Sequence, residues 1–576
     1  MEEYCPVPFH NIRITDGFWR RRQDVNRGVT LKAVFDRFSE THRFDALNCK
    51  RSAEYEPHIF WDSDVAKWIE GAAYLLAEER DDELERLCDG LIDKIVSNQA
   101  EDGYFNSYYL AVGPECRFTK RENHELYCAG HLIEAAVAYR NATGKDAFLR
   151  SMCRYADLIY DVFYVKNSAT FMTPGHEEIE LALFRLADAT GEEKYAKLAL
   201  RFLDARGNNV KDANHLYLDG SYDQSHKPLK KQTEAVGHAV RAGYVYSAMA
   251  DAARRFGDGE YAAACEKLFD NIVNCKMYVT GGIGSTGSGE AFTSDYDLPN
   301  KTAYAETCAA IALAYFARRM LLLKPDSRYA DTIERVMYNG ALSGVSLDGE
   351  KFFYSNPLET SLPGAGRAKV FDCSCCPPNI LRFIASITED FYTYSGDVLF
   401  VHQFAASEAN VCGASVKQET SYPANGEIKL AVKGGFKKAA LRIPGWCSSF
   451  TLSEPYELID GYAYAVIPES REITLTLDMP ARLVRSHPAV TENEGKAAVM
   501  RGPIVYCMEG KDNGSLDDIL LCKDGKFEEE YSETLGVPLL KTTGSRGGSP
   551  APLTLIPYFA QANRGADEMK VWIKTT

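Results

Sequence analysis

The sequence predicts a mainly helical protein with additional β structure: an (α/α)6 barrel over residues 1–396, followed by β-sandwich domains. Apolar residues recur at positions i, i+3, i+4 and i+7 from about residue 24 to residue 396, which is the period of amphipathic helices. After residue 396 the pattern changes to the alternation typical of strands, interrupted by Gly, Pro and Asn. A chain of 576 residues is also longer than one domain usually is, so more than one hydrophobic core is expected.

The helical part is predicted to contain twelve helices, which fall into six pairs. Short turns join the two helices of a pair, for example NATGKDAFL at 141–149, DATGEEKYA at 188–196 and RFGDGEYAA at 255–263. In each turn a Gly ends one helix and an acidic residue begins the next, which makes an antiparallel hairpin. Repeated hairpins with long loops at one end favour a closed ring whose loops form the functional face; an open solenoid is the alternative. The predicted helices cover residues 22–41, 63–77, 82–98, 124–142, 146–163, 176–190, 192–206, 234–256, 259–276, 303–324, 327–343 and 379–395.

The β-rich part is predicted to form two domains, a β-sandwich at 397–490 and a smaller β-domain at 491–576. Segments such as DVLFVHQF, GEIKLAVKG and REITLTLDMP alternate apolar and polar residues, as strands with one buried face do. A second set of strand patterns begins with AAVMRGPIVYCME at 497–509 and ends with MKVWIK at 569–574. Much of the sequence between these two segments reads as loops, so the second domain is expected to be small.

The composition excludes some classes of partner. Lys and Arg number 65 against 81 Asp and Glu, a net charge of −16, so we expect neither nucleic acid nor an anionic membrane as a partner. Aromatic residues make up 11% of the chain and 33 residues are Tyr, whose flat face and hydroxyl suit sugar rings. The first residues lack a leader pattern and no stretch is apolar enough for a membrane span, so a cytoplasmic protein is expected. Its 16 cysteines are then expected as thiols, available for a metal or for nucleophilic chemistry.

The densest chemical signal is the segment CSCCPPN at 373–379. The adjacent thiols of Cys375 and Cys376 do not readily form a relaxed disulfide with each other, but as thiolates they can share a soft metal such as zinc. The Pro pair that follows favours the start of a helix, and a helix N-terminus lowers the pKa of a thiol. The alternative is that the cysteines are small buried core residues, because the spacing is not that of a zinc finger.

A zinc ion needs further ligands, and the segment AYAETC at 303–308 offers two at a predicted helix start. Glu306 and Cys308 lie two residues apart, so in a regular helix they would point to different sides. Both could reach one metal only if the first turn is irregular, which the Asp, Pro and Asn just upstream favour. Taken alone, a Glu that complements the helix dipole beside a core Cys is the alternative. With the Cys pair, these two residues make a set of three cysteines and one glutamate.

The glycine-rich segment GGIGSTGSGE at 281–290 contains a formal GxGxxG pattern. A nucleotide-binding loop is excluded, because no helix follows, the surroundings are helical and not βαβ, and no GK[ST] is present. The flexible backbone can instead approach a ligand closely, and the segment ends in a carboxylate, Glu290. A solvated loop acid is the alternative for this residue.

Three histidines, His124, His176 and His238, each lie at or near the start of the first helix of a predicted pair. In a barrel these positions point toward the loop-rich end. They match no HExxH motif, so we assign them to sugar hydroxyls and not to the metal; structural hydrogen bonding is the alternative. Glu334 and Tyr354 are weaker candidates, for which a helix-face acid and a core tyrosine are the respective alternatives.

Four motifs occur together and in this order: GGIGSTGSGEAF, DLPNKTAYAETCA, ERVMYNG and CSCCPPN. With them, the sequence resembles glycoside hydrolase family 127, the β-L-arabinofuranosidases, over most of its length. The resemblance implies a retaining, exo-acting hydrolase that releases β-L-arabinofuranose from plant-derived oligosaccharides or glycopeptides. It also implies a Zn2+ cofactor held by three cysteines and a glutamate, with one of those cysteines as the nucleophile.

The resemblance also implies a role for each matching residue. Cys375 would be the nucleophile and a zinc ligand, and Glu290 the general acid/base. The metal site would be completed by Glu306, Cys308 and Cys376. The sugar pocket would be lined by His124, His176, His238, Glu334 and Tyr354. Cys373 receives no role.

Other functions stay open at this point. A glycosidase that acts on another rare pectic sugar with the same site, an N-acyl sugar epimerase, and a non-catalytic carbohydrate-binding protein with a structural zinc are compatible with the fold. An epimerase would not need the Cys pair or the β-rich tail. We expect a small carbohydrate substrate as the partner, no nucleic acid and no membrane, and leave a homodimer as an open alternative.

Overall fold

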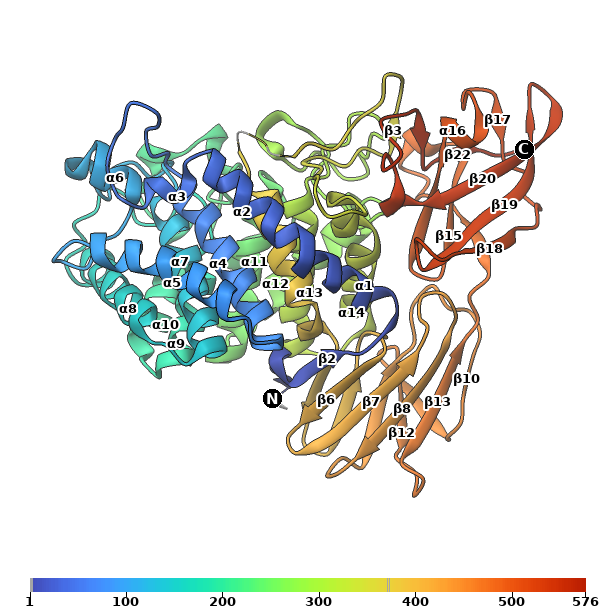
Figure 1. Cartoon of the computed structure of the whole chain (residues 1–576), viewed down its shortest axis with the longest axis horizontal. Helices are drawn as coiled ribbons and strands as arrows, with labels where there is room; N and C mark the ends of the chain where they lie inside the picture. Colours follow the sequence, from blue (N-terminus) through green and yellow to red (C-terminus); the bar gives the residue numbers. More distant parts are fainter. Residues whose placement is uncertain (1–3, 370, 372) are drawn as a thin grey trace. The chain divides into compact units, whose positions relative to one another are not determined.

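The computed structural model describes residues 4–369, 371 and 373–576. Most helices precede the main β-sheets along the chain, so the predicted fold class, a helical part followed by β domains, is confirmed (Figure 1). Within the described residues, no helix has both the length and the apolar composition that are needed to cross a membrane. The closure of six helix pairs into a ring stays a prediction.

The chain is organised as two compact units, and both are discontinuous in sequence. The helical unit consists of Asn26–Asn271 and Lys369–Ser386. The mixed unit consists of Met1–Val25, Ile272–Ala368 and Ile387–Thr576, and it contains all the strands of the described part. The predicted domain limits after positions 396 and 490 are not the limits of these units, because N-terminal and central segments join the β-rich part.

The helical unit is built from hairpins of consecutive helices. Its helices are α2 (Leu31–Glu40), α3 (Arg43–Ala46), α4 (Trp61–Glu78), α5 (Asp82–Asn98), α6 (Ser107–Val112), α7 (Glu125–Thr143), α8 (Ala147–Tyr160), α9 (Ile179–Thr190), α10 (Glu193–Ala205), α11 (Ala239–Phe256), α12 (Gly259–Asn271) and α15 (Cys376–Ala385). The first helices of the hairpins, α4, α7, α9 and α11, are buried along most of their length, whereas α5, α8, α10 and α12 bury one face.

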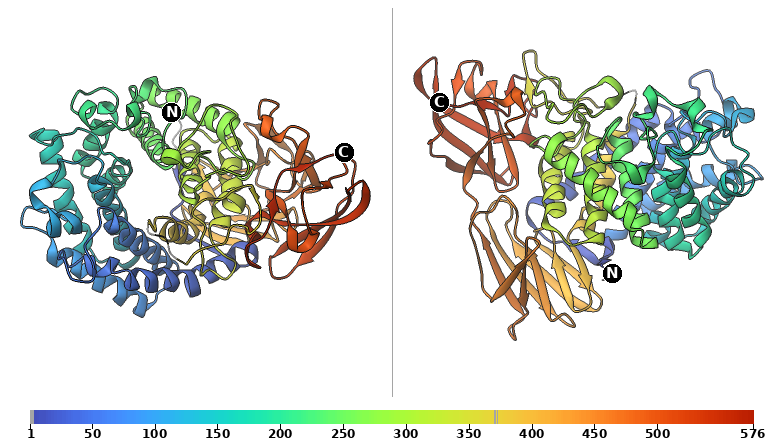
Figure 2. Two further views of the ribbon diagram at one scale, coloured as in Figure 1. Left: turned by 90° about the horizontal axis from the view of Figure 1, so that it is seen from above. Right: turned by 180° about the vertical axis from the view of Figure 1, so that it is seen from behind.

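The buried helices form one continuous layer within this unit. Helix α4 contacts α7, α7 contacts α9, and α9 contacts α11, while α15 also contacts α4. The hairpins follow one another along an arc (Figure 2, left). Gly144, Gly191 and Gly257 come directly after α7, α9 and α11 with φ values of 75°, 75° and 65°, which is the left-handed conformation that ends a helix. The short turns predicted from the sequence therefore do end these helices.

Helix α15 is fastened to α4 by a buried ion pair and by close packing. Arg382 on α15 donates to a Glu70 carboxylate oxygen at 2.7 Å and to the Tyr244 hydroxyl at 3.1 Å, and both charged side chains are buried. Gly71 lies against α15, because a Cβ added there would be 2.9 Å from the Leu381 side chain. The position of α15, and with it that of its first residues, is set by these contacts with α4.

The mixed unit contains four α-helices among its described residues and a two-sheet sandwich. The helices are α1 (Gly17–Val25), α13 (Thr307–Leu323), α14 (Ser327–Arg335) and α16 (Gly510–Asn513). One sheet has the order β1-β4-β5-β9-β12-β11 and the other the order β10-β13-β8-β7-β6-β2. The strands are β1 (Cys5–Pro6), β2 (Ile12–Ile14), β4 (Tyr392–Ser395), β5 (Val398–Val401), β6 (Ser407–Val411), β7 (Ala414–Thr420), β8 (Glu427–Lys433), β9 (Lys438–Arg442), β10 (Phe450–Leu452), β11 (Tyr456–Ile459), β12 (Tyr462–Val466) and β13 (Glu472–Leu477). Hydrogen bonds from Gln418 to Tyr392, at 2.7 Å, and between Tyr392 and Ser407, at 3.0 Å, join the two sheets.

The N-terminal residues belong to this sandwich and not to the helical part. Strand β1 pairs with β4, and β2 pairs with β6, both antiparallel. The sequence-based assignment of residues 1–396 to the helical domain misses these strands. They are two and three residues long, too short for the alternation of apolar and polar residues to be recognised.

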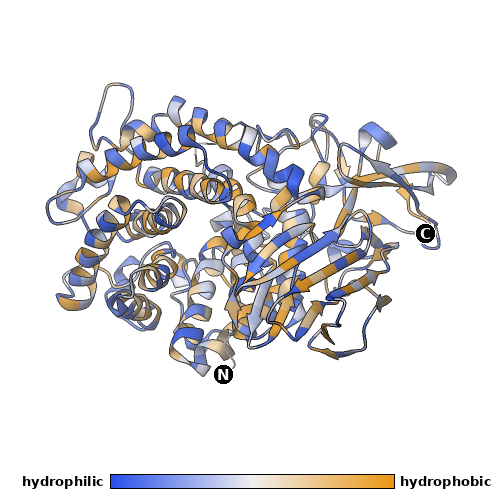
Figure 3. Cartoon of the chain, turned by 60° about the horizontal axis from the view of Figure 1, so that its bottom comes forward, coloured by the Kyte–Doolittle hydropathy of each residue, from blue (hydrophilic) through white to orange (hydrophobic). Residues whose placement is uncertain are grey.

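A third sheet follows, with the main order β14-β15-β16-β20-β19-β17. Its strands and the short strands that pair with it are β3 (Glu359–Thr360), β14 (Ala481–Val484), β15 (Lys496–Arg501), β16 (Ile504–Glu509), β17 (Ile519–Leu520), β18 (Glu528–Ser532), β19 (Val537–Arg546), β20 (Ser549–Pro557), β21 (Met569–Lys570) and β22 (Ile573–Lys574). Because β14 pairs with β15, this sheet begins before position 491. Figure 3 shows bands of hydrophobic and hydrophilic residues along the strands, as expected for sheets with one buried face.

Replacing Glu70 by Gln would leave Arg382 buried without its anionic partner. We expect a loss of about 3–5 kcal/mol in the free energy of unfolding of the helical unit at pH 7. Burial acts to raise the pKa of Glu70, but the charges of Arg382 and Arg185 outweigh this effect and lower that pKa. This stabilisation is therefore present above the unfolded-state pKa of about 4.3 and is lost as the pH falls through the folded-state pKa. Urea denaturation followed by circular dichroism should show a difference from the wild type that shrinks at acid pH.

The matched control for this variant is Lys32→Gln, which breaks an exposed ion pair with Asp36 on α2. Its cost is expected to be below about 0.5 kcal/mol. Equal losses in the two variants would contradict the special role of the buried pair.

Candidate active site

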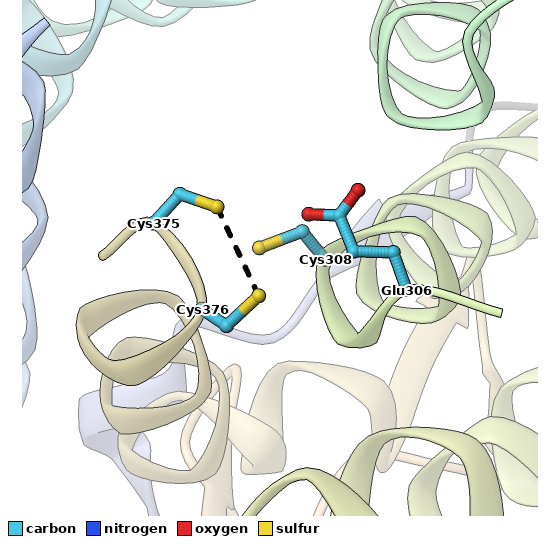
Figure 4. Close-up of side chains that lie close together, drawn as sticks. All are labelled: Glu306, Cys308, Cys375 and Cys376. Atoms are coloured by element: carbon cyan, nitrogen blue, oxygen red, sulfur yellow. Dashed lines mark hydrogen bonds between the residues drawn. The ribbon is translucent and has the colours of Figure 1, made fainter. Parts of the chain in front are cut away.

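Four potential metal ligands lie together in the structure (Figure 4). Glu306, Cys308, Cys375 and Cys376 each offer one ligand atom, and these atoms all lie within 4.8 Å of one another. The sulfurs of Cys375 and Cys376 are 3.8 Å apart. A tetrahedral zinc with a Zn–S distance of about 2.3 Å holds two sulfurs about 3.8 Å apart, so the spacing fits this ion. Three soft thiol donors and one carboxylate also favour zinc over Mg2+ or Ca2+.

The Cys pair lies at the first turn of α15. The helix begins at Cys376, with Cys375 as the preceding N-cap residue and a Pro in the first turn. This start is three positions earlier than predicted, because the fixed φ of Pro suits the first helical turn. Cys376 is buried and Cys375 half-buried, so Cys375 is the more accessible sulfur of the two. Cys373 is half-buried and does not belong to the group of four.

Glu306 and Cys308 reach the same point because Glu306 precedes the helix. Helix α13 begins at Thr307, and Glu306 is its N-cap residue with an extended ψ of 139°. Ala305 before it has φ 39°, a left-handed conformation that is unusual for a residue with a Cβ. An isolated bridge between Glu306 and Ser355 holds this backbone in place. The irregular helix start required by the two-residue spacing is therefore present, and both side chains are buried.

The glycine-rich segment packs tightly against the backbone next to these ligands. A Cβ at Gly281 would lie 3.0 Å from the Val336 backbone nitrogen, and one at Gly282 would lie 3.0 Å from the Ala305 Cβ. Close approach of the backbone therefore requires glycine here. The segment ends at the half-buried Glu290, which has one carboxylate oxygen within 4.8 Å of a Glu306 oxygen. Glu290 thus lies beside the metal-ligand group as a carboxylate that is not one of its four members.

Two tyrosines form a hydrogen-bonded chain to Glu290. Tyr304 donates to the Glu290 carboxylate and accepts from Tyr354, and burial together with the charges of Glu306 and Glu290 raises the pKa of Tyr304. Tyr304 therefore keeps its proton at neutral pH and can orient the carboxylate. Sequence reasoning found Tyr354 but missed Tyr304, although this residue lies inside the DLPNKTAYAETCA motif, two positions before Glu306.

The three predicted histidines form a row in the helical unit. The ring centroids of His124 and His176 are 5.6 Å apart, and those of His176 and His238 are also 5.6 Å apart. Burial, with the nearby charge of Arg241, lowers the pKa of His124 to about 3 and that of His176 well below its usual value. Both rings are neutral at pH 7. The Nδ1–H of His176 donates to the Glu177 carbonyl oxygen at 2.9 Å, which leaves its Nε2 as an acceptor for a sugar hydroxyl. Tyr127, which sequence reasoning missed, extends the row, with its ring centroid 4.2 Å from that of His176.

Glu334 has a different environment from the other candidates. Its carboxylate accepts hydrogen bonds from Arg442 at 2.6 Å, from the Tyr422 hydroxyl at 2.5 Å and from the Trp446 indole at 3.0 Å. All these residues belong to the mixed unit, and Glu334 is almost fully buried. This environment favours a structural role for Glu334; the sugar contact implied by the resemblance stays a prediction.

Comparison with known proteins agrees with the motifs over the whole chain. Profiles of the catalytic, middle and C-terminal domains of glycoside hydrolase family 127, the first described as the β-L-arabinofuranosidase catalytic domain, match residues 11–389, 398–478 and 481–574. The non-reducing end β-L-arabinofuranosidase of Bifidobacterium longum subsp. longum is 35% identical, over 98% of this chain and 99% of its own.

Solved structures show the same similarity. The crystal structure of Ara127N-Se, a β-L-arabinofuranosidase of this family from Geobacillus stearothermophilus T6, is 41% identical with a TM-score of 0.92, over 98% of this chain and 100% of its own. Another β-arabinofuranosidase of the family is 36% identical with a TM-score of 0.91, over 100% of this chain and 98% of its own. The chain therefore belongs to glycoside hydrolase family 127 and is a glycoside hydrolase.

Proposed function

We propose that this chain is a retaining β-L-arabinofuranosidase that releases β-L-arabinofuranose from the ends of plant-derived oligosaccharides or glycopeptides. The observation that carries the proposal is the group of three thiols and one carboxylate with Glu290 beside it. Most retaining glycosidases use one carboxylate as the nucleophile and another as the acid/base. Here thiols lie next to a carboxylate that is not a member of their group, which favours a cysteine as the nucleophile. The similarity to enzymes named as β-L-arabinofuranosidases supports the sugar specificity.

Zn2+ is the proposed cofactor, held by Glu306, Cys308, Cys375 and Cys376. When bound, zinc would keep the thiols deprotonated at neutral pH. The three thiolates and the carboxylate together carry more negative charge than one divalent ion neutralises. The remaining charge would favour the positive charge that develops on the sugar ring in the transition state.

In the first step, the Cys375 sulfur would attack the anomeric carbon. The bond between sulfur and C1 forms while the bond between C1 and the leaving oxygen breaks, and Glu290 gives its proton to that oxygen. Tyr304, which donates to Glu290, would hold the carboxyl group in place for this transfer.

In the second step, Glu290 would take a proton from a water molecule. The water oxygen attacks C1 and the bond between C1 and sulfur breaks, which restores the Cys375 thiolate and releases the sugar with its configuration retained. The neutral His124 and His176, together with His238 and Tyr354, would bind the sugar hydroxyls during both steps.

The proposal places the enzyme in the cytoplasm, with small carbohydrates as substrates and neither nucleic acid nor membrane as partners. The net charge of −16 supports the absence of polyanionic partners. Imported oligosaccharides would then be the substrates. Cell fractionation that finds the protein outside the cell would contradict this part of the proposal.

The first test is the choice of sugar. The purified protein should hydrolyse p-nitrophenyl β-L-arabinofuranoside and leave the α-L isomer intact, because only one anomer presents C1 to the sulfur with the leaving oxygen on the opposite side. Release of nitrophenolate measures both rates. Preferred cleavage of a different glycoside would overturn the sugar assignment while leaving the cysteine mechanism open to test.

The second test concerns the nucleophile and the metal. Elemental analysis should find about one zinc per chain, and Cys375→Ser should lower kcat/KM by more than about 10³-fold because the covalent step is lost. Cys412→Ser changes an exposed cysteine in the sandwich and serves as the control with unchanged activity. Active protein without zinc, or rapid turnover by Cys375→Ser, would refute the mechanism.

The third test separates the acid/base from the metal ligands. Glu290→Gln should keep the zinc content and lower kcat by about 10²–10⁴-fold, the range that general acid–base catalysis contributes. Asp297→Asn, an exposed acid of the same connecting segment, is the control. If Glu290→Gln loses its zinc, the residue is a ligand and the assignment as acid/base is wrong.

A further inference from the structure

A second polar pocket lies in the mixed unit, lined by residues from different parts of its sequence. It has a volume of about 190 Å³ and is lined at the end of α14 by Asp331, Glu334 and Arg335. Trp446, from the loop after β9, and Arg482 on β14 also line it. The two-step mechanism proposed above uses none of the charged groups of this pocket.

The two acidic side chains of the pocket are already occupied by protein donors. The Asp331 carboxylate accepts from Arg442 at 2.5 Å and from the Gly445 backbone nitrogen at 2.9 Å. The Glu334 carboxylate accepts from Arg442 and Trp446, as described above, and from a tyrosine hydroxyl. Arg442 itself is fully buried. Each of the four carboxylate oxygens therefore has a hydrogen-bond donor other than Arg335 and Arg482, although the charges of both acids still act on Arg335.

The guanidinium groups of Arg335 and Arg482, unlike the two carboxylates, make few hydrogen bonds with the protein. In the part of the chain that the structure describes, no side-chain hydrogen bond or ion pair involves Arg335. Among the described residues, the Gly502 carbonyl oxygen is the only acceptor for the Arg482 side chain, at 3.3 and 3.4 Å. Burial and the charge of Arg335 lower the pKa of Arg482 to about 10. Burial also lowers the pKa of Arg335, while the charges of Asp331 and Glu334 act to raise it. Counted with Arg442, three arginines face two carboxylates here, and an anion beside Arg335 and Arg482 would offset the remaining positive charge.

Trp446 supplies a flat apolar wall beside these cations. The Arg482 guanidinium lies over the indole ring, 5.6 Å from its centroid, and the indole N–H is engaged by Glu334. The ring is therefore held in one orientation. An aromatic face next to paired guanidinium groups is suited to a ligand with an oxyanion at one end and an apolar face, such as a sugar acid.

We propose that this pocket is a binding site for a small oxyanion, either the carboxylate of an acidic sugar or a phosphate, held by Arg335 and Arg482 beside Trp446. The volume is below the range of about 300–1,000 Å³ typical of pockets for drug-sized ligands, so the ligand is no larger than about one sugar ring. The site goes beyond the proposed hydrolysis and does not depend on it, because it uses neither the cysteines nor Glu290.

The test is direct binding to the full-length protein at constant ionic strength. Ligand-observed NMR titrations with D-glucuronate and with inorganic phosphate should show binding, whereas the neutral methyl ester of glucuronate should bind at least tenfold more weakly. Tighter binding of glucuronate than of phosphate identifies a sugar acid as the ligand class, and the reverse order identifies a phosphate. If neither anion binds the wild-type protein, the proposal is wrong, whatever the variants do.

Variants then locate the binding site. Arg335→Gln and Arg482→Gln should each weaken anion binding at least tenfold, and Arg13→Gln, an exposed arginine on β2 of the same unit, should leave it unchanged. Circular dichroism melting checks that each variant is folded. Anion binding that survives in the folded Arg335→Gln/Arg482→Gln double variant would overturn the assignment to this pocket.

Discussion

The site of this enzyme depends on bringing three thiols and a carboxylate within 4.8 Å of one another. As anions these groups would repel one another, and the proposed metal ion and the helix N-termini would supply the compensating positive charge. Both sources fit the structure: Glu306 caps α13, and the Cys pair begins α15. Each ligand is thus held by a helix start, where the partial positive charge of the backbone is greatest.

The local features around the site follow from this requirement. Ala305 adopts a left-handed conformation and Glu306 precedes the helix, so that the Glu306 carboxylate and the Cys308 sulfur lie close together. The glycines at the start of the preceding loop permit close packing against Ala305, and the end of the loop carries Glu290. Buried contacts of Arg382 fix α15, and therefore the sulfurs at its start. Strain and buried charge occur where the chemistry needs a fixed geometry.

Within the mixed unit, the strands also hold a helix in place. Arg442 from β9 binds the two carboxylates of α14 and thereby fastens this helix to the sandwich. Neighbouring residues on the same helix differ in their contacts: Glu334 accepts hydrogen bonds from this network, while Arg335 lines a pocket and, among the described residues, makes no side-chain hydrogen bond. A fold that satisfies one set of charges can in this way leave another set available for a ligand.

Much of the fold and the metal-ligand group could be predicted from the sequence, because helix periodicity, the glycine stops and the CSCCPPN and AYAETC motifs are local patterns. The tertiary structure decided what local patterns do not contain. It placed the short strands β1 and β2 in the sandwich. It paired Glu334 with Arg442 and hydrogen-bonded Tyr304 to Glu290. It also brought Arg335 to the same pocket as Arg482. These outcomes depend on contacts between residues far apart in the chain or on the direction of one side chain, and neither leaves a period or a motif in the sequence.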